Sequence, residues 1–287
     1  MIQELRLNNH LYPALLKEIN DPPEKIFLRG ELKADEPCFA IVGTRKPSAY
    51  GIEAAKYFAR GLCEAGFTIV SGLALGIDAV VHQEVLSCKK RTIAVLGSGI
   101  DSITPMTNRK IGEEILKTGA IISEFPENYP AMKQNFPQRD RIMSGLSYGV
   151  LVIEAQLRSG ALITARLGLE QGREVFAVPG EIFSLNSKGA NHLIQEGAKL
   201  AASIEDILEE FQNIPEIQKM ILKQNNLFDL DEKHKRVLEF LSEPRTIEEL
   251  CEMTKMSSNE LGSLLTILEL KNILKRRQDG RFQRNNS

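Results

Sequence analysis

The stretch FTIVSGLALGIDAVVH, residues 67–82, passes from an apolar run through small residues into a helical pattern. In its first part Ile69 and Val70 stand side by side without polar alternation, which is typical of a strand that a parallel sheet buries on both faces. Small residues such as Gly72 and Gly76 then mark a turn before the helix. The stretch therefore predicts one strand–turn–helix unit of an α/β fold.

The same unit repeats along the chain on both sides of this stretch. Short apolar runs at residues 39–43, 91–99, 120–124, 149–155 and 174–180 alternate with helical patterns at 48–65, 76–87, 107–118, 138–147 and 161–172. Parallel strands need crossover connections, and helices are the usual ones. We therefore expect an α/β fold built on an extended Rossmann-like, doubly wound, mostly parallel sheet.

A second, smaller domain is expected at the C-terminal end. Three amphipathic helical patterns, the second with Thr246 as N-cap and Glu249 three residues on, precede two strand-like flanks around Asp279-Gly280. This order predicts a winged-helix domain. The expected division is an N-terminal extension at 1–37, the Rossmann-like domain at 38–215, a polar linker at 216–230 and the winged-helix domain at 231–287.

Composition narrows the class of protein. The chain has 287 residues, 43% of them hydrophobic and 26% charged, close to the roughly 45–50% and 25% of globular proteins. The formal net charge of −2 argues against general attraction to a polyanion but allows a local cationic groove. Neither a signal peptide nor an apolar run of about 20 residues is found, so we expect a cytoplasmic protein without membrane contact. The four cysteines lack the spacing of a metal site.

Small residues follow several of the predicted strands, at the sheet edge where ligands of parallel sheets bind. They are Gly43-Thr44-Arg45, Ser71-Gly72, Gly97-Ser98-Gly99, and Ser159-Gly160 leading to Thr164. Such loops let backbone amides approach an anion, and an arginine suits a phosphate bidentately. Each loop could also be a tight turn only, and Arg45 an ordinary surface residue. The G-x-G-x-x-G fingerprint of dinucleotide sites is missing, so no cofactor is expected.

The segment KQNFPQRDR, residues 133–141, places a ring among cations. A cationic track with an aromatic platform is what binding of single-stranded nucleic acid requires, and Pro137 is expected to keep Phe136 extended. The alternative is that Phe136 is a core residue. Asp78 and His82, four residues apart, could form an acid–base couple or a structural pair that fixes the loop at the helix start; no catalytic centre is evident.

These motifs resemble the family of DNA processing protein A, also called DprA or Smf. The resemblance rests on AIVGTRKPSAYG, TIVSGLALGIDAVVH, IAVLGSGID, ISEFP, NFPQRDRIMSGLS, VIEAQLRSGALITARLGLEQGREVFAVPG and SKGANHLIQEGA, which lie in order over roughly residues 40–198. It implies a non-enzymatic homodimer that binds single-stranded DNA and helps to load the RecA recombinase on DNA coated by single-strand-binding protein, as in natural transformation.

The resemblance also implies where the DNA binds. Lys133, Arg45 and Arg139 would hold the backbone while Phe136 meets a base, although Arg141 could face the fold instead of the strand. The family's usual Arg-Asn-Arg is Arg139-Asp140-Arg141 in this chain, and its usual Tyr-Pro is Thr104-Pro105. The predicted DNA-binding residues are Gly43, Thr44, Arg45, Ser71, Gly72, Lys133, Phe136, Arg139, Arg141, Ser159, Gly160 and Thr164.

Two other functions stay open on sequence alone. A nucleotide-processing enzyme of the lysine-decarboxylase-like, phosphoribohydrolase type would use a related sheet, with Glu154 ahead of the loop, but the glycine run of that type is absent from EAQLRSGALITA. The winged helix could instead bind duplex DNA through the cations of KRRQDGRFQR, residues 275–284. Its would-be recognition helix carries Glu260 and Glu269, which favours a protein contact or a weak backbone contact.

Overall fold

The computed structural model consists of two compact units, residues 1–224 and 225–287. The residues described are 2–214, 217, 232–241, 243–270, 273–277 and 280–284. The linker predicted at 216–230 lies outside them apart from Ile217, which is buried. None of the helices in these ranges is long and apolar enough to cross a bilayer.

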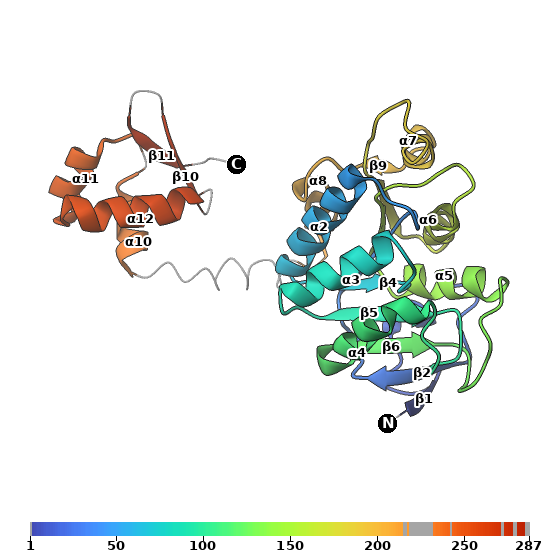
Figure 1. The fold of residues 1–287 in the computed structure, drawn as a ribbon. Helices are drawn as coiled ribbons and strands as arrows, with labels where there is room; N and C mark the ends of the chain where they lie inside the picture. The colour runs from blue at the N-terminus through green and yellow to red at the C-terminus, as the bar shows by residue number, and fades with distance from the viewer. Residues whose placement is uncertain are drawn as a thin grey trace. The chain divides into compact units, whose positions relative to one another are not determined.

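A nine-stranded sheet forms the centre of the first unit (Figure 1). Its strand order is β1-β2-β6-β5-β4-β3-β7-β8-β9, and all neighbours from β6 to β9 are parallel. The strands are β1 (Ile2–Arg6), β2 (Lys25–Gly30), β3 (Cys38–Val42), β4 (Thr68–Ser71), β5 (Thr92–Leu96), β6 (Ala120–Ser123), β7 (Gly149–Val152), β8 (Glu174–Ala177) and β9 (Lys199–Leu200). The predicted doubly wound, Rossmann-like sheet is confirmed.

The strand order reverses between β3 and β7, which pair in parallel with Ala40 opposite Val150. From β3 the chain moves outward through β4, β5 and β6, and then returns to add β7, β8 and β9 on the other side. Loops diverge at such a reversal and leave a crevice at the carboxyl ends of the strands. The reversal therefore marks where a ligand site is expected.

Helices cover both faces of the sheet. Successive strand residues point to opposite faces, so Phe39 and Ile41 pack with α2 and α3, whereas Ala40 and Val42 pack with α5 and α6. Among the described residues, the helices of this unit are α1 (Ala14–Lys17), α2 (Ala49–Glu64), α3 (Ile77–Ser87), η1 (Met106–Asn108), α4 (Arg109–Thr118), α5 (Asn135–Gly145), α6 (Gly160–Glu170), α7 (Lys188–Gln195), α8 (Glu205–Leu208) and η2 (Glu209–Phe211).

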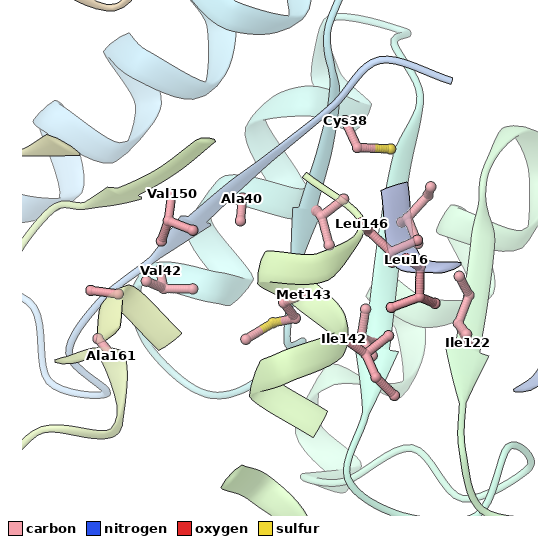
Figure 2. Close-up of a cluster of buried hydrophobic side chains, with 14 of the residues drawn as sticks. Leu16, Cys38, Ala40, Val42, Ile122, Ile142, Met143, Leu146, Val150 and Ala161 are labelled. Atoms are coloured by element: carbon pink, nitrogen blue, oxygen red, sulfur yellow. The ribbon is translucent and has the colours of Figure 1, made fainter. Parts of the chain in front are cut away.

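Residues 1–37, expected as an extension, take part in this sheet. Strand β2 pairs antiparallel with β6 and with β1, which places β1 at the edge. Leu16 of α1 is fully buried beside α5. Figure 2 shows Ile142 and Met143 of α5 and its C-cap residue Leu146 in one apolar cluster with Leu16 and Val42. The N-terminal residues thus help to hold α5 in place.

Among its described residues the second unit has three helices and a hairpin, as a winged-helix domain requires. The elements are α10 (Glu232–Glu239), α11 (Ile247–Thr254), α12 (Ser258–Leu270), β10 (Leu274–Arg276) and β11 (Phe282–Arg284). The predicted cap of α11 is present: Thr246 Oγ1 accepts from the Glu249 amide, and Glu249 reaches back to the Thr246 amide. Antiparallel pairing of β10 and β11 forms the wing. Asp279, predicted in its turn, lies outside the described residues.

Candidate nucleic-acid interface

A cavity of about 250 Å³ opens at the carboxyl edge of the sheet, where the strand order reverses. Its walls come from the segments that follow β3, β4 and β7 and from one side of α5. The lining residues are Val42, Gly43, Arg45, Ala74, Asp78, Phe136, Arg139, Asp140, Met143, Ser159, Gly160, Ala161 and Thr164. The structure thus brings together residues from four separate sequence motifs.

Helix α5 delivers the aromatic and cationic side chains to this cavity. The helix begins at Asn135 rather than near residue 138, so Phe136 and Pro137 lie in its first turn. The expectation that Pro137 keeps Phe136 extended is therefore wrong, because proline is tolerated in a first turn, where its missing N–H has no partner in the helix. Asn135 fixes this turn: its Nδ2 donates to the carbonyls of Gly97 and Pro130, both at 3.1 Å.

The ring of Phe136 is half-buried and lies between two guanidinium groups. Its centroid is 5.5 Å from Cζ of Arg45 and 5.9 Å from Cζ of Arg139, within the range of cation–π attraction. A Cβ atom on Gly97 would lie only 2.9 Å from Cδ1 of the ring, so the ring packs on the backbone at the end of β5. Phe136 is thus both a packed residue and a wall of the cavity.

Arg139 is buried, in contrast to an ordinary phosphate-binding arginine. Its Nη1 donates to the Val95 carbonyl at 3.0 Å, and its Nε lies 3.0 Å from Oδ1 of Asp140. A Cβ atom on Gly72 would lie 1.6 Å from Nη1, so this glycine makes room for the guanidinium. Arg139 therefore lines the cavity as an internally bonded group at 5% exposure.

Two buried carboxylates, Asp78 and Asp140, face Arg139 in the same cavity. Burial raises the pKa of Asp140 to about 6, against the opposing attraction of Arg139. Burial also raises the pKa of Asp78, and Arg139 and the amides of the loop after β4 oppose the rise. The interior of the cavity therefore holds positive and negative groups together.

Asp78 and His82 take separate structural partners instead of forming an acid–base couple. Oδ2 of Asp78 accepts from the amides of Gly72 and Ala74 at 3.2 and 3.3 Å, which fixes the loop after β4. His82 is fully buried with Nδ1 2.8 Å from Oγ1 of Thr92, and burial lowers its pKa to about 3. The structural interpretation holds for Asp78, whereas His82 joins α3 to β5.

The exposed cations lie around the cavity mouth and before α5. Arg45 is exposed beside the Phe136 ring, and Lys133 is exposed in the turn that precedes α5. Within the described part of the chain neither side chain forms an ion pair with a carboxylate. Lys133 does not line the cavity. Both charges are available to an external anion.

The start of α6 supplies polar backbone to the opposite wall. Ser159 is the N-cap, and its Oγ accepts from the Ala161 amide at 3.3 Å. Gly160 is exposed, and a Cβ atom there would meet nothing within 4 Å. Thr164, one turn on, is buried and lines the cavity. The positive end of this eleven-residue helix adds to the local attraction for an anion.

Several predicted site residues have their side chains occupied elsewhere. Arg141 pairs with Glu124 at 2.7 Å and with Asp21 at 3.1 Å and does not line the cavity. The hydroxyl of Ser71 donates to the Ile41 carbonyl, and Oγ1 of Thr44 accepts from the Lys46 amide. Gly72 and Ser71 shape the loop beneath Arg139. For these residues a direct DNA contact stays a prediction.

Sequence reasoning missed Asn135, Ala74, Ala161 and Met143. The two last are apolar wall residues whose helical spacing signals burial only. Asn135 could have been noticed as a polar residue directly before an aromatic–proline pair, but its two carbonyl partners lie up to 38 positions away in the sequence. Such partners are set by the sheet order and leave no local signal.

Glu154, the acid of the alternative enzyme, is used to cap a helix. It is buried, and its carboxylate accepts from the Ser48 amide at 2.9 Å and from the Ser48 hydroxyl at 2.6 Å, at the start of α2. A Cβ atom on Gly51 would lie 2.2 Å from Oε2. These contacts bind the carboxylate to Ser48, the N-cap residue of α2. In the winged-helix unit, Lys275, Arg276, Arg277, Arg281 and Arg284 are all exposed.

Comparison with known proteins gives two family matches. Residues 4–212 match the model for DNA recombination-mediator protein A, and residues 223–280 match the DprA winged helix domain. Protein Smf of Escherichia coli K12 is 46% identical over 207 residues, which cover 71% of this chain and 55% of that protein. DNA processing protein DprA of Bacillus subtilis is 43% identical over 211 residues, covering 73% and 71%.

Solved structures agree with these matches. The X-ray structure of DNA processing protein A from Streptococcus pneumoniae has a TM-score of 0.69 and 40% identity, over 73% of this chain and 74% of that one. The Helicobacter pylori protein, whose structure is described as giving insights into its unique single-stranded DNA binding mode, has a TM-score of 0.66 and 31% identity, over 74% and 95%. With a family model covering most of its length, this chain belongs to the DNA recombination-mediator protein A (DprA/Smf) family.

Proposed function

We propose that this chain binds single-stranded DNA without catalysis and places one base in the cavity at the sheet edge. The observation that carries the proposal is the Phe136 ring, half-buried between the guanidinium groups of Arg45 and Arg139 at the mouth of a 250 Å³ cavity. Stacking on an aromatic ring contributes about 1–3 kcal/mol per base and tolerates any sequence. The ligand class follows from this pairing of ring and cations.

The interior of the cavity and its surroundings suit different parts of a nucleotide. Arg45 and Lys133 are exposed and carry no ion pair among the described residues, so they suit phosphate. Inside, Asp78 and Asp140 would repel a phosphate, and Arg139 already binds the Val95 carbonyl. The interior therefore suits an uncharged base, with the backbone running outside past the start of α6.

The role in recombination rests on the family. A recombination mediator that holds single strands would help to load RecA, with single-strand-binding protein present on the same DNA, during natural transformation in the cytoplasm. We propose this role and a homodimeric state for this chain. The supports are the family match over residues 4–212 and the single-stranded DNA binding described for the Helicobacter pylori relative.

Fluorescence anisotropy of labelled single strands and duplexes over a salt series tests the proposal. We expect tighter binding of the single strand and affinity that falls as salt rises. Arg6, an exposed arginine on edge strand β1, gives a matched control: Arg6→Ala keeps wild-type affinity. Equal affinity for single strand and duplex would contradict the proposal.

A variant of the wing tests in the same assay whether the second unit contributes to DNA binding. Lys275→Ala/Arg276→Ala removes two exposed cations of β10. Under the proposal it leaves single-strand affinity within about twofold, because neither residue lines the cavity and exposed substitutions outside a site have small effects. A selective loss of duplex binding would assign a duplex-binding role to the wing.

A further inference from the structure

The carboxylate of Asp140 is a cavity-lining acceptor with little internal hydrogen bonding. The residue is 5% exposed and lines the cavity. Across the residues the structure describes, its one polar partner is Nε of Arg139, 3.0 Å from Oδ1. An ionised carboxylate has about four acceptor positions, so most of its capacity is unused. Because Asp140 lines the cavity, these positions can accept hydrogen bonds from a ligand that enters it.

The ligand's donors must be uncharged. The charged groups of the cavity are Asp78, Asp140, Arg139 and Arg45, two carboxylates and two guanidinium groups whose formal charges balance. Burial of a further ion beside this set would cost more than burial of neutral N–H groups. Neutral N–H donors at the edge of a planar ring are what a nucleobase offers, and the ring of Phe136 lines the same cavity.

We propose that Asp140 gives this chain a preference for guanine at the base-binding cavity. Guanine carries two adjacent donors, N1–H and N2–H₂, on its Watson–Crick edge, and these match the two oxygens of one carboxylate. Adenine and cytosine place a ring-nitrogen acceptor beside a single amino donor. Thymine places two carbonyl oxygens around its one N–H. Edge reading of this kind is how proteins select unstacked bases.

The inference rests on the proposed function, since it needs a base in the cavity. The expected preference for guanine over the other bases is about tenfold or more, the discrimination that a pair of hydrogen bonds to one base usually provides. Stacking on Phe136 and the phosphate contacts of Arg45 do not depend on base identity. The preference should therefore reside in Asp140 and be separable from overall affinity.

The test uses the full chain and short oligothymidine strands at pH 8. One strand has a single central guanine, a second has inosine there, which lacks the N2 amino group, and a third has 7-deazaguanine, which keeps both donors. We expect the guanine and 7-deazaguanine strands to bind about tenfold tighter than plain oligothymidine, and the inosine strand to lose most of that gain. This comparison needs no variant.

Asp140→Asn then assigns the effect to its residue. The amide is similar in shape but offers one acceptor and one donor group, so the guanine preference, taken as the ratio of the guanine-strand and plain oligothymidine affinities of the same variant, should fall below about twofold. Equal binding of guanine and thymine strands by the wild type would overturn the inference alone. Failure to bind any strand would overturn the proposed function as well.

Discussion

The interior of the cavity and its rim use the same residue type in opposite ways. Arg139 inside is buried, bonded to the Val95 carbonyl and paired with Asp140. Arg45 at the rim is exposed and contacts the Phe136 ring without a carboxylate partner among the described residues. Burial thus decides which cation holds the site together and which is available to DNA. A motif that counts cations cannot make that distinction.

The largest expected effect is a loss of stability when Arg139, the buried cation of the cavity interior, is replaced. Arg139→Met leaves Asp78 and Asp140 buried without their cation, and removing one partner of a buried ion pair costs about 3–5 kcal/mol. Urea unfolding should show this loss at pH 8 and a smaller loss at pH 5, because protonation then neutralises Asp140. Arg45→Met, the control at the rim, should change the free energy of unfolding by less than about 0.5 kcal/mol. Equal losses in both variants would remove the distinction between interior and rim.

The next largest effect is a loss of single-strand affinity when the Phe136 ring is removed. Phe136→Ala should weaken single-strand binding by about 1–3 kcal/mol, the usual contribution of a stacked base, with little change in the salt dependence. Anisotropy at several salt concentrations measures both quantities. Wild-type affinity in this variant would mean that Phe136 is a packing residue only.

A pH series tests whether the ionised carboxylate of Asp140 is responsible for the guanine preference. The pKa of Asp140 is raised to about 6, so the carboxylate is ionised at pH 8 and roughly nine-tenths protonated at pH 5. Protonation replaces an acceptor by a donor that faces the donors of guanine. We expect the preference for the guanine strand to fall to about twofold at pH 5, and the oligothymidine affinity to change far less. A preference that stays constant from pH 8 to pH 5 would contradict this assignment.

The smallest effect is expected outside both regions. Arg141 of α5 forms ion pairs with Glu124 and with Asp21 of the N-terminal region. Arg141→Gln should therefore leave affinity within about twofold and the salt slope at its wild-type value. A reduced slope in this variant would return Arg141 to the set of phosphate contacts.

Much of the fold could be predicted from the sequence because its parallel strands are apolar on both faces. The runs that became β3, β4, β5 and β7 are of this kind, and the small residues predicted after β3 and β7 do line the cavity. Strands β1 and β2 were not predicted. Strand β1 alternates exposed and buried residues weakly at the sheet edge, and its partner β2 is defined by pairing with distant β6.

The interior of the site was harder to predict than its rim. Neighbouring residues on a helix point in different directions, so the letters of Arg139-Asp140-Arg141 do not reveal which side chains face the cavity. The structure turns Arg139 and Asp140 inward and Arg141 toward Glu124. This division depends on how α5 packs on the sheet and on α1, at residues far away in the sequence.

The salt dependence of the rim tests the central claim most directly. Each phosphate contact on a single strand contributes about 0.7 to the slope of log affinity against log salt. The double variant Arg45→Ala/Lys133→Ala should therefore reduce the magnitude of the slope for oligothymidine by about 1.4. Phe136→Ala should lower affinity and leave the slope unchanged. Equal slopes in the wild type and both variants would contradict the division between a phosphate-binding rim and a base-binding interior.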